Sequence, residues 1–387
     1  MTSHLVEKNK GSNPLKDTLI GGRFRILKRL GSGSFGGVYM GVNIHSGVNV
    51  AVKLESVRNH GCAMLEHRIY NYFNECTLPI GIPRSHFAGR VGDYNVIVID
   101  LLGPNLEELF NICGRKFSPK TVCIIGIQII QRLQCMHSMH YIHRDIKPEN
   151  FVMGVGDDSH TVYIIDMGLA KRYRDPVTLQ HIPWEEKKGL TGTVRYVSIN
   201  THRGIQQSRR DDMESVMYLL FYFLRGGLPW QGMRTQPNDM HYEAISDVKM
   251  ATSPDKLGMG FPTQFAQLLQ YSRALDFYEV PQYSYYVRLL HEALASIGES
   301  FDYQYPWSAK LDPCVAEIRG DTDSLEEDII EKSASRAKRF NRRLTATNAT
   351  QCRTFVDDAF HLMPCGPSDG TASLLELRDY YGIDLFF

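Results

Sequence analysis

The sequence lacks the features that mark secreted, zinc-binding or membrane-spanning chains. Its eight cysteines are scattered, and no two of them have a C-x-x-C spacing. Because structural disulfides need an oxidising compartment and zinc needs clustered ligands, we expect reduced thiols in an intracellular protein. No stretch approaches the apolar length that spans a bilayer, and the polar N-terminus has no secretory signal. A soluble protein of the cytoplasm is expected, with the nucleus as a second compartment and no membrane partner.

Net charge is also absent. The 43 lysines and arginines balance 43 aspartates and glutamates, so the chain as a whole does not attract nucleic acid. The 43% hydrophobic content is that of an ordinary globular protein. A chain of 387 residues is long enough for more than one structural unit, each with its own core. We expect a monomer without a nucleic-acid partner.

The character of the sequence changes along the chain and predicts four segments. Residues 1–22 are a polar leader. Residues 23–102 hold one helical stretch, MLEHRIYNYF, and four short β-branched runs separated by Gly or Asn, which we expect to be strands: FRILKRL, GVYMGVN, NVAVKLE and YNVIVIDLL. Residues 103–308 carry longer apolar runs at helical spacing, and two of these are apolar almost all round and therefore buried. Residues 309–387 form a tail with acidic and basic runs, partly disordered or docking, with a regulatory role as one option. The fold class is α+β.

The first motif with a candidate chemical role is a glycine-rich stretch. GSGSFGGV fits G-x-G-x-x-G-x-V, in which Gly31, Gly33 and Gly36 let a strand-turn-strand backbone lie close over phosphates. Alone, such a stretch is often only a hairpin. The next strand, however, carries Lys53 in the apolar run VAVK, and the following helix supplies Glu66. A buried ammonium needs a counter-charge, so we expect these two side chains to pair.

A second polar stretch, YIHRDIKPEN, places Asp145, Lys147 and Asn150 at fixed offsets. The carboxylate can accept or orient a hydroxyl proton, the lysine can neutralise a transferring phosphoryl group, and the amide oxygen can ligate a metal. Asp166 then follows a hairpin-like insert and stands beside Gly168, where a carboxylate can hold Mg²⁺ against nucleotide phosphates. The order of these groups predicts phosphoryl transfer from ATP. The predicted catalytic residues are Asp145, Lys147, Lys53 and Glu66, and the predicted metal ligands are Asn150 and Asp166.

These motifs, in this order, resemble the signature set of the protein kinases over about residues 24–307. Lys147, two residues after Asp145, is similar to the serine/threonine kinases rather than the tyrosine kinases. LLGPNLEELF, LTGTVRYVSINTHRGIQQSRRDDMES and GGLPWQGMR resemble the casein kinase I family specifically. The resemblance implies a bilobal fold with a β-rich N-lobe (23–102), a helical C-lobe (103–308) and ATP in the cleft between them.

The resemblance also implies which residues contact the nucleotide. Asp100 to Leu102 would present backbone groups to adenine, and Ile26, Val38 and Ala51 would be apolar walls. The whole implied set is Gly31, Ser32, Gly33, Gly36, Ile26, Val38, Ala51, Lys53, Ile99, Asp100 and Leu102.

The casein kinase I family prefers protein substrates that are acidic, or already phosphorylated, about three residues before the target Ser or Thr. Two anion sites carry over from it: one comprises Arg195, Gly226 and Arg234, and the other Arg144, Lys171 and Lys188. Clusters of Arg and Lys bind phosphate through charge-assisted hydrogen bonds, although a solvated basic face has the same composition. An anion held there would fix the activation segment, so we expect activity without phosphorylation of that segment.

Several stretches depart from what is usual. The loop RNHGCAM before Glu66 is short, TQPNDMHYE replaces a basic cluster of the family, and SIN stands where most kinases have Ala-Pro-Glu, as it does in casein kinase I. Met167 replaces the usual Phe between Asp166 and Gly168. Met fills irregular apolar gaps and removes no ligand, so we still expect an active enzyme. The alternative is a pseudokinase that binds nucleotide as a scaffold, but such proteins usually lack at least one member of the polar set, which is complete here.

Overall fold

The structure, a computed structural model, describes residue 15 and residues 18–33, 36–58, 62–76, 80–233 and 238–308. The chain divides into two units, residues 1–317 and 318–387, and every described residue belongs to the first. The expectations for Arg234, for the tail from 309 to 387 and for most of the leader lie outside the described residues.

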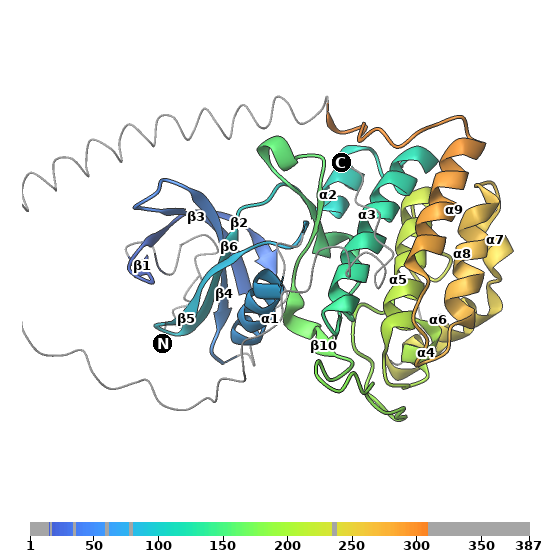
Figure 1. Cartoon of the computed structure of the whole chain (residues 1–387), viewed down its shortest axis with the longest axis horizontal. Coiled ribbons are helices and arrows are strands. Elements are labelled where there is room, and N and C mark those ends of the chain that lie inside the picture. The colour runs from blue at the N-terminus through green and yellow to red at the C-terminus, as the bar shows by residue number, and fades with distance from the viewer. Residues whose placement is uncertain are drawn as a thin grey trace, which may run out of the picture. The chain divides into compact units, whose positions relative to one another are not determined.

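The N-terminal part is a six-stranded antiparallel sheet with the order β1-β2-β3-β4-β6-β5 (Figure 1). Its strands are β1 (Leu19–Ile20), β2 (Phe24–Gly33), β3 (Gly36–Asn43), β4 (Asn49–Ser56), β5 (Ser85–Val91) and β6 (Tyr94–Asp100). One helix, α1 (Ala63–Cys76), follows β4 and packs beside β5 and β6. The four strands and the helix read from the sequence are present. The sheet begins at Leu19, inside the range 1–22 expected as leader, and Ile20 is fully buried.

Strand β4 shows how the sheet sorts its side chains. Val50, Val52 and Leu54 are buried in one apolar cluster with Val96 and Val98 of β6. Side chains alternate between the two faces of a strand, so Ala51 and Lys53 point to the other face. Lys53 therefore lies on the face of the sheet opposite this apolar cluster.

The C-terminal part is helical (Figure 1). Its helices are α2 (Leu106–Ile112), α3 (Pro119–Ser138), α4 (Ile199–His202), α5 (Arg209–Arg225), α6 (Asn238–Ala251), α7 (Pro254–Gly258), α8 (Thr263–Ala274) and α9 (Tyr283–Ser296). Ser118 caps α3 by accepting the Thr121 N–H, with Pro119 in the first turn. Every residue of α5 from Arg209 to Leu224 is buried. Burial of the apolar part of α5 was predicted from the sequence, whereas burial of the charged residues Arg209 to Asp212 was not. No helix in the described ranges is long and apolar enough to cross a bilayer.

Short strands and turns lie between α3 and α4 and carry the polar motifs. β7 (Tyr141–Ile142) pairs with β10 (Lys171–Arg172), and β8 (Phe151–Met153) pairs with β9 (Val162–Ile164) as the predicted hairpin. The turns η1 (Pro148–Asn150), η2 (Gly156–Asp158) and η3 (Met167–Leu169) separate them. The link between the two parts is tied down here, because Gly103 donates its N–H to the Met153 carbonyl at 2.8 Å. The architecture is the α+β, two-lobed arrangement expected from the sequence.

Candidate active site

Lys53 lies at the centre of a cluster of carboxylates. Its Nζ is 2.9 Å from Oε2 of Glu66 on α1 and 3.2 Å from Oδ1 of Asp166. The pair expected from the sequence is therefore formed, and Asp166 joins it. Burial lowers the pKa of Lys53, but the carboxylates of Glu66 and Asp166 outweigh this effect and raise it. The lysine is thus held as a cation facing the end of β9 and the following turn.

Glu55 is a third carboxylate in this cluster, and the sequence reading missed it. It is fully buried, and its Oε1 lies 3.3 Å from Lys53 Nζ. Its Oε2 accepts the N–H of Ala63, the first residue of α1, at 3.0 Å. Glu55 therefore ties the start of α1 to β4 while it faces the lysine. The available signal was its position two residues after Lys53, which places both side chains on one face of the strand.

The turn that begins at Asp166 is held from α1. Asp166 has left-handed backbone geometry, with φ of 65°, which is uncommon for a residue other than glycine. Its N–H donates to the Tyr70 hydroxyl at 3.0 Å, and that hydroxyl in turn donates to Oε1 of Glu66 at 3.3 Å. Burial raises the pKa of Asp166, but Lys53 outweighs burial and lowers it, so the carboxylate is ionised. Tyr70 was also missed, because nothing in the local sequence links it to a residue so far along the chain.

Met167 is fully buried in the main apolar core. A Cβ at the next position, Gly168, would lie 3.1 Å from Oδ1 of Asp166 and 3.4 Å from Cβ of Cys62. The turn therefore keeps an apolar plug and a small residue beside the carboxylate. Met167 fills the position without displacing the group that would bind a metal.

The loop around η1 brings the second set of predicted residues together. Lys147 Nζ lies 2.6 Å from Oδ2 of Asp145, and Asn150 donates through Nδ2 to the Asp145 carbonyl at 2.8 Å. The hydroxyl of Thr193 donates to Oδ1 of Asp145 at 2.7 Å, a contact that the sequence did not predict. Asp145 is thus oriented by groups on both of its carboxylate oxygens.

This loop is anchored to α5 by Asp212. Oδ2 of Asp212 accepts the N–H of His143 at 2.8 Å, and Oδ1 accepts the N–H of Arg144 at 2.9 Å. His137 of α3 lies 2.9 Å from the same carboxylate. Burial raises the pKa of Asp212, and the hydrogen bonds and charges of His137 and His143 outweigh it, so the pKa is lowered. An ionised buried carboxylate therefore fixes the backbone next to Asp145.

The glycine-rich hairpin lies beside Lys53 in the sheet. Gly31 is opposite Val38, Val38 is opposite Lys53, and Ala51 is opposite Ile99 in the strand register. The remaining hairpin pairs are Ser32 with Gly37 and Gly33 with Gly36. A Cβ on Gly36 would come within 1.7 Å of the Leu54 carbonyl oxygen, so only glycine fits there.

One expected nucleotide contact, Ile26, is not placed with the others. It is 3% exposed and packs in the cluster of Val50 and Val52, on the face opposite Ala51. This expectation is corrected by strand register: Ile26 is opposite Gly41, Gly41 is opposite Val50, and directly paired residues share a face of the sheet. β2 also has a bulge between Arg29 and Gly31. Leu30, at that bulge and 47% exposed, is the apolar residue next to the glycine-rich hairpin.

Asp100 ends β6 and is held by the neighbouring strand. It donates its N–H to the Arg84 carbonyl at 3.1 Å, and its carboxylate accepts the Arg84 N–H at 2.8 Å. Its Oδ1 also lies 2.7 Å from Nε2 of His86. The side chain and N–H of Asp100 are thus occupied within the lobe. The expected contact of adenine with the backbone from Asp100 to Leu102 stays a prediction.

The first predicted anion cluster is brought together. Burial lowers the pKa of Lys171, and the neighbouring charges of Arg144 and Lys188 lower it further. Arg144 donates through Nε to the Leu169 carbonyl at 2.7 Å, and Lys171 donates to Gln206 at 2.9 Å. Lys188 pairs with Glu185. Arg144 and Lys188 therefore both act on the charge of Lys171, and Arg144 contacts the segment that follows Asp166.

The second predicted cluster is described in part. The guanidinium of Arg195 lies 5.6 Å from the ring centre of Tyr222, whose hydroxyl accepts from Arg115 at 2.6 Å. Gly226 ends α5 with φ of 80°, and a Cβ there would lie 3.3 Å from the Arg115 carbonyl. Arg195 and Arg115 thus both lie beside the ring of Tyr222, whose backbone carbonyl accepts the Gly226 N–H at 3.0 Å. Arg115 is a further cation that the sequence reading missed. Arg234 is outside the described residues.

Comparison with known protein families identifies the family to which this chain belongs. A model of the protein kinase domain matches residues 24–272, more than half of the chain. The chain belongs to the protein kinase family. The match covers β2 to β6 of the sheet, α1 and the C-lobe through most of α8, including Lys53, Glu66, Asp145 and Asp166. Membership implies the use of ATP, of a divalent metal ion and of protein substrates.

The donor set of the kinase domain fits a divalent ion that a nucleotide helps to hold. No group of three or more His, Cys, Asp or Glu side chains in the described ranges could bind a metal unaided. An ion such as Mg²⁺ needs only one or two protein ligands when phosphates and water supply the rest. Asp166 offers an ionised carboxylate, and the Nδ2 group of Asn150 is turned to Asp145, which leaves its amide oxygen as the ligand.

Replacing Tyr70 by Phe is expected to lower kcat about 3- to 10-fold, because one net hydrogen bond that holds the Asp166 turn is lost. The KM for the divalent ion should rise, since the carboxylate is positioned less well. Steady-state kinetics with titrated Mg²⁺ would measure both effects. The matched control is Tyr163→Phe, which removes a hydroxyl that lies 3.4 Å from Asp158 in the β8–β9 hairpin. Equal kinetics for Tyr70→Phe and the parent would show that the hydroxyl does not position the turn.

Proposed function

We propose that this protein is an active serine/threonine kinase of the casein kinase I type, which transfers the γ-phosphoryl group of ATP to acidic or phosphate-primed proteins. The observation that supports this most is the completeness of the polar set and its mutual contact. Lys53 is paired with Glu66 at 2.9 Å, and Asp145 is oriented by Lys147 at 2.6 Å. A scaffold that only binds nucleotide has no use for the second pair, so transfer is the better supported of the two functions.

Each residue has a role that follows from its surroundings. Asp145 would accept or orient the proton of the substrate hydroxyl, with Thr193 and Lys147 fixing its two oxygens. Lys53, a cation held by Glu66, would position the nucleotide phosphates. Asn150 and Asp166 would hold the divalent ion, which neutralises charge on the phosphates when it is bound.

Preference for serine and threonine is inferred from Lys147, which follows Asp145 by two residues and lies in contact with it. Lys147 would also stabilise the negative charge of the transferring phosphoryl group. The finer assignment to casein kinase I rests on the sequence segments that resemble that family, including SIN at residues 198–200.

The preference for acidic or phosphorylated substrates is supported by the two groups of cations. Arg144 and Lys188 both act on the charge of Lys171, and Arg195 lies beside the ring of Tyr222, whose backbone carbonyl accepts the Gly226 N–H. Arg144 is also held by the Leu169 carbonyl at 2.7 Å, a contact within the polypeptide that needs no phosphate. This contact supports activity without phosphorylation of the activation segment.

Phosphate transfer to paired peptides would test the proposal. One peptide carries phosphoserine three residues before the target serine, and the other carries alanine there. We expect a higher kcat/KM for the primed peptide. Lys171→Ala or Arg195→Ala should reduce that advantage by roughly 10- to 100-fold, the effect of losing a hydrogen bond to a charged group. Lys256→Ala, which removes an exposed cation of α7, is the matched control.

Three outcomes would count against parts of this function. No transfer to either peptide would favour the nucleotide-binding scaffold. Equal kcat/KM for both peptides would remove the anion preference but leave the kinase. Loss of activity after treatment with a phosphatase, once the phosphatase has been removed, would show that the enzyme depends on its own phosphorylation.

A further inference from the structure

The segment from Thr193 to Ile199 links the catalytic carboxylate to the body of the C-lobe. Its first residue, Thr193, donates to Oδ1 of Asp145 at 2.7 Å. Its last residues open the short helix α4, where most protein kinases carry Ala-Pro-Glu and this chain carries Ser198, Ile199 and Asn200. The anchor of this segment must therefore come from other elements.

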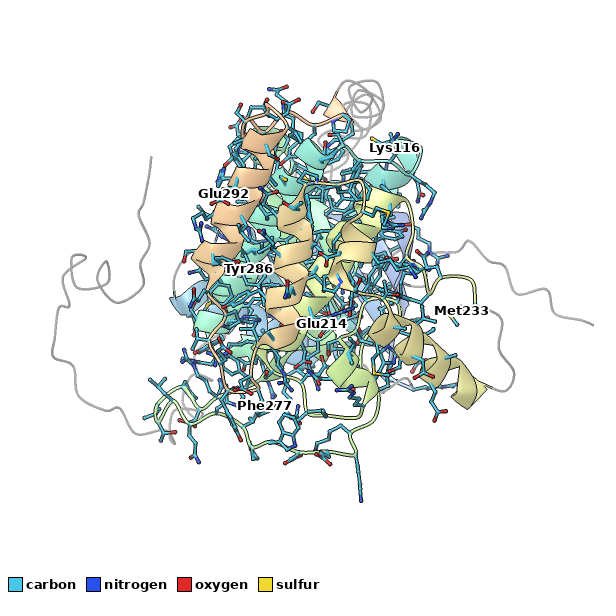
Figure 2. All side chains as sticks on the ribbon, turned by 90° about the vertical axis from the view of Figure 1, so that its right-hand side faces the viewer. Lys116, Glu214, Met233, Phe277, Tyr286 and Glu292 are labelled. Carbon is cyan, nitrogen blue, oxygen red and sulfur yellow. The ribbon has the colours of Figure 1, made fainter. Side chains whose placement is uncertain are left out.

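A buried carboxylate on α5 holds the C-terminal end of the segment. Oε1 of Glu214 accepts the N–H of Ile199 at 3.1 Å and the hydroxyl of Tyr218 at 2.5 Å. Glu214 is 2% exposed and lies in the interior of the helical lobe (Figure 2). Nearby, Ser198 donates its hydroxyl to Asp211 at 2.6 Å. Two acidic side chains of α5 thus bind consecutive residues of the segment.

Arg273 of α8 supplies the positive charge beside Glu214. Its Nε lies 4.0 Å from Oε1 of Glu214, and its Nη2 donates to the Tyr218 hydroxyl at 3.1 Å. The same guanidinium donates to the carbonyls of Lys249 at 3.1 Å and Thr252 at 2.9 Å. Arg273 therefore joins α5 and α8 to the C-terminal end of α6.

Lys249 of α6 holds the middle of the segment. Its ammonium is completely buried and donates to the carbonyls of Val194 at 2.8 Å and Val197 at 2.6 Å. It lies 5.1 Å from the ring centre of Tyr218 and 5.4 Å from that of Trp230, within the range of a cation–π contact. Trp230 in turn donates to the Arg195 carbonyl at 2.8 Å.

Burial of the Lys249 amine is unfavourable in free energy. Burial lowers its pKa to about 7, because a charged amine is disfavoured away from water. His202, 3.1 Å from the amine, has its pKa lowered to about 3 by burial and by the lysine charge. A buried amine is retained in such a place when its hydrogen bonds specify one arrangement of the chain around it.

We propose that Lys249, together with Glu214 and Arg273, is the anchor that positions the segment Thr193–Ile199 for binding of the protein substrate. Lys249 is a positioning residue: it acts through the carbonyls of Val194 and Val197, and its hydrogen bonds to described residues do not include Asp145. Because Thr193 contacts Asp145 while Arg195 is a proposed anion contact, the placement of this segment decides where the target hydroxyl sits. The inference rests on the proposed kinase function and adds the residue that sets substrate placement.

The test is Lys249→Met, which keeps the apolar stem and removes the donors. In the full-length protein, kcat/KM for the primed peptide is expected to fall about 10- to 100-fold, as substrate misplacement of about 1 Å does. The KM for ATP should stay within about twofold, since the contacts of Lys249 all lie in the C-lobe. ATP hydrolysis without peptide should fall less than peptide transfer, because Lys147 still holds Asp145 when the contact of Thr193 is disturbed. Hydrogen exchange of the Tyr196 and Val197 amides, which donate to the Thr193 carbonyl, should become faster.

The matched control is Lys120→Met, which removes a C-lobe ammonium paired with Asp302 at 2.7 Å and Glu299 at 2.9 Å. It should leave the peptide KM unchanged. If Lys249→Met does not fold, Trp230→Phe removes the bond to the Arg195 carbonyl together with part of the ring that packs on Lys249 and Tyr218. It should raise the peptide KM while the KM for ATP stays within about twofold. If both variants fold, their effects on peptide kcat/KM should be less than additive, because they hold the same stretch.

Each remaining result is decisive. If the parent is active and Lys249→Met has unchanged peptide kinetics, the anchor is overturned while the kinase function stands. If only Trp230→Phe folds, unchanged peptide kinetics in that variant lead to the same conclusion. An equal loss of peptide transfer and of peptide-free ATP hydrolysis shows a general structural role instead. An inactive parent overturns the proposed kinase function, and the anchor for substrate binding falls with it. Unchanged exchange at Tyr196 and Val197 also contradicts the anchor, independently of any activity.

Discussion

Replacing Asp145 by Asn is expected to lower kcat for phosphoryl transfer by about 10²- to 10⁴-fold, the usual contribution of a positioned acid or base. Asn keeps an oxygen that can accept the Thr193 hydroxyl, which now lies at 2.7 Å, but it cannot take a proton or balance the Lys147 charge. The loss should appear in kcat and in kcat/KM alike, since the group acts in the transition state.

Single-turnover transfer of labelled phosphate would measure this effect, and thermal unfolding would show that the variant folds. Asp158→Asn is the matched control, because Asp158 is an exposed carboxylate of η2. We expect it to transfer phosphate at the parental rate. An Asp145→Asn protein that retained more than about a tenth of the parental kcat would exclude a role as acid or base.

Lys53→Met is expected to have the second large effect, on both activity and stability. Removing one partner of a buried ion pair typically costs about 3–5 kcal/mol, because the opposite charge is left buried and unpaired. Here three carboxylates lose their cation: Glu66 at 2.9 Å, Asp166 at 3.2 Å and Glu55 at 3.3 Å. The kcat should also fall about 10²- to 10³-fold, as it does when a fixed donor at a reacting group is removed.

Urea unfolding would measure the free energy of unfolding, and transfer assays the kcat. Adding Glu55→Gln to the Lys53→Met protein should recover part of the stability, because one buried charge is neutralised while the amide oxygen can still accept the Ala63 N–H. That second change should recover no activity. A Lys53→Met protein as stable as the parent would mean that the carboxylates find protons or water without the lysine.

Most of the fold could be read from the sequence, and the misses have clear causes. β2, β3, β4, β6 and the long helices carry strong apolar periodicity over seven or more residues. β5 was missed because all of its residues are only partly buried or exposed, so its sequence shows no apolar alternation. β1 is two residues long, too short for any pattern. Both are edge strands of the sheet, where one side lacks a neighbour.

Ile26 shows a different limit. The family resemblance placed this residue of β2 in the nucleotide pocket, but the strand register puts it opposite Gly41 and on the face of Val50. Ile26 packs with Val50 and Val52, and Leu30 is the apolar neighbour of the hairpin. A shift of one residue moves a side chain to the opposite face, and only strand pairing specifies it.

By itself, the sequence determined which chemical groups are present and in what order: Lys53, Glu66, Asp145, Asn150 and Asp166, each in a motif short enough for local spacing to fix its offset. The tertiary structure alone decided what holds those groups in place. Tyr70 meets Asp166 across 96 residues, and Lys249 meets Val197 across 52. Such contacts leave no periodic signal, because each depends on how whole helices pack rather than on the spacing of neighbouring residues.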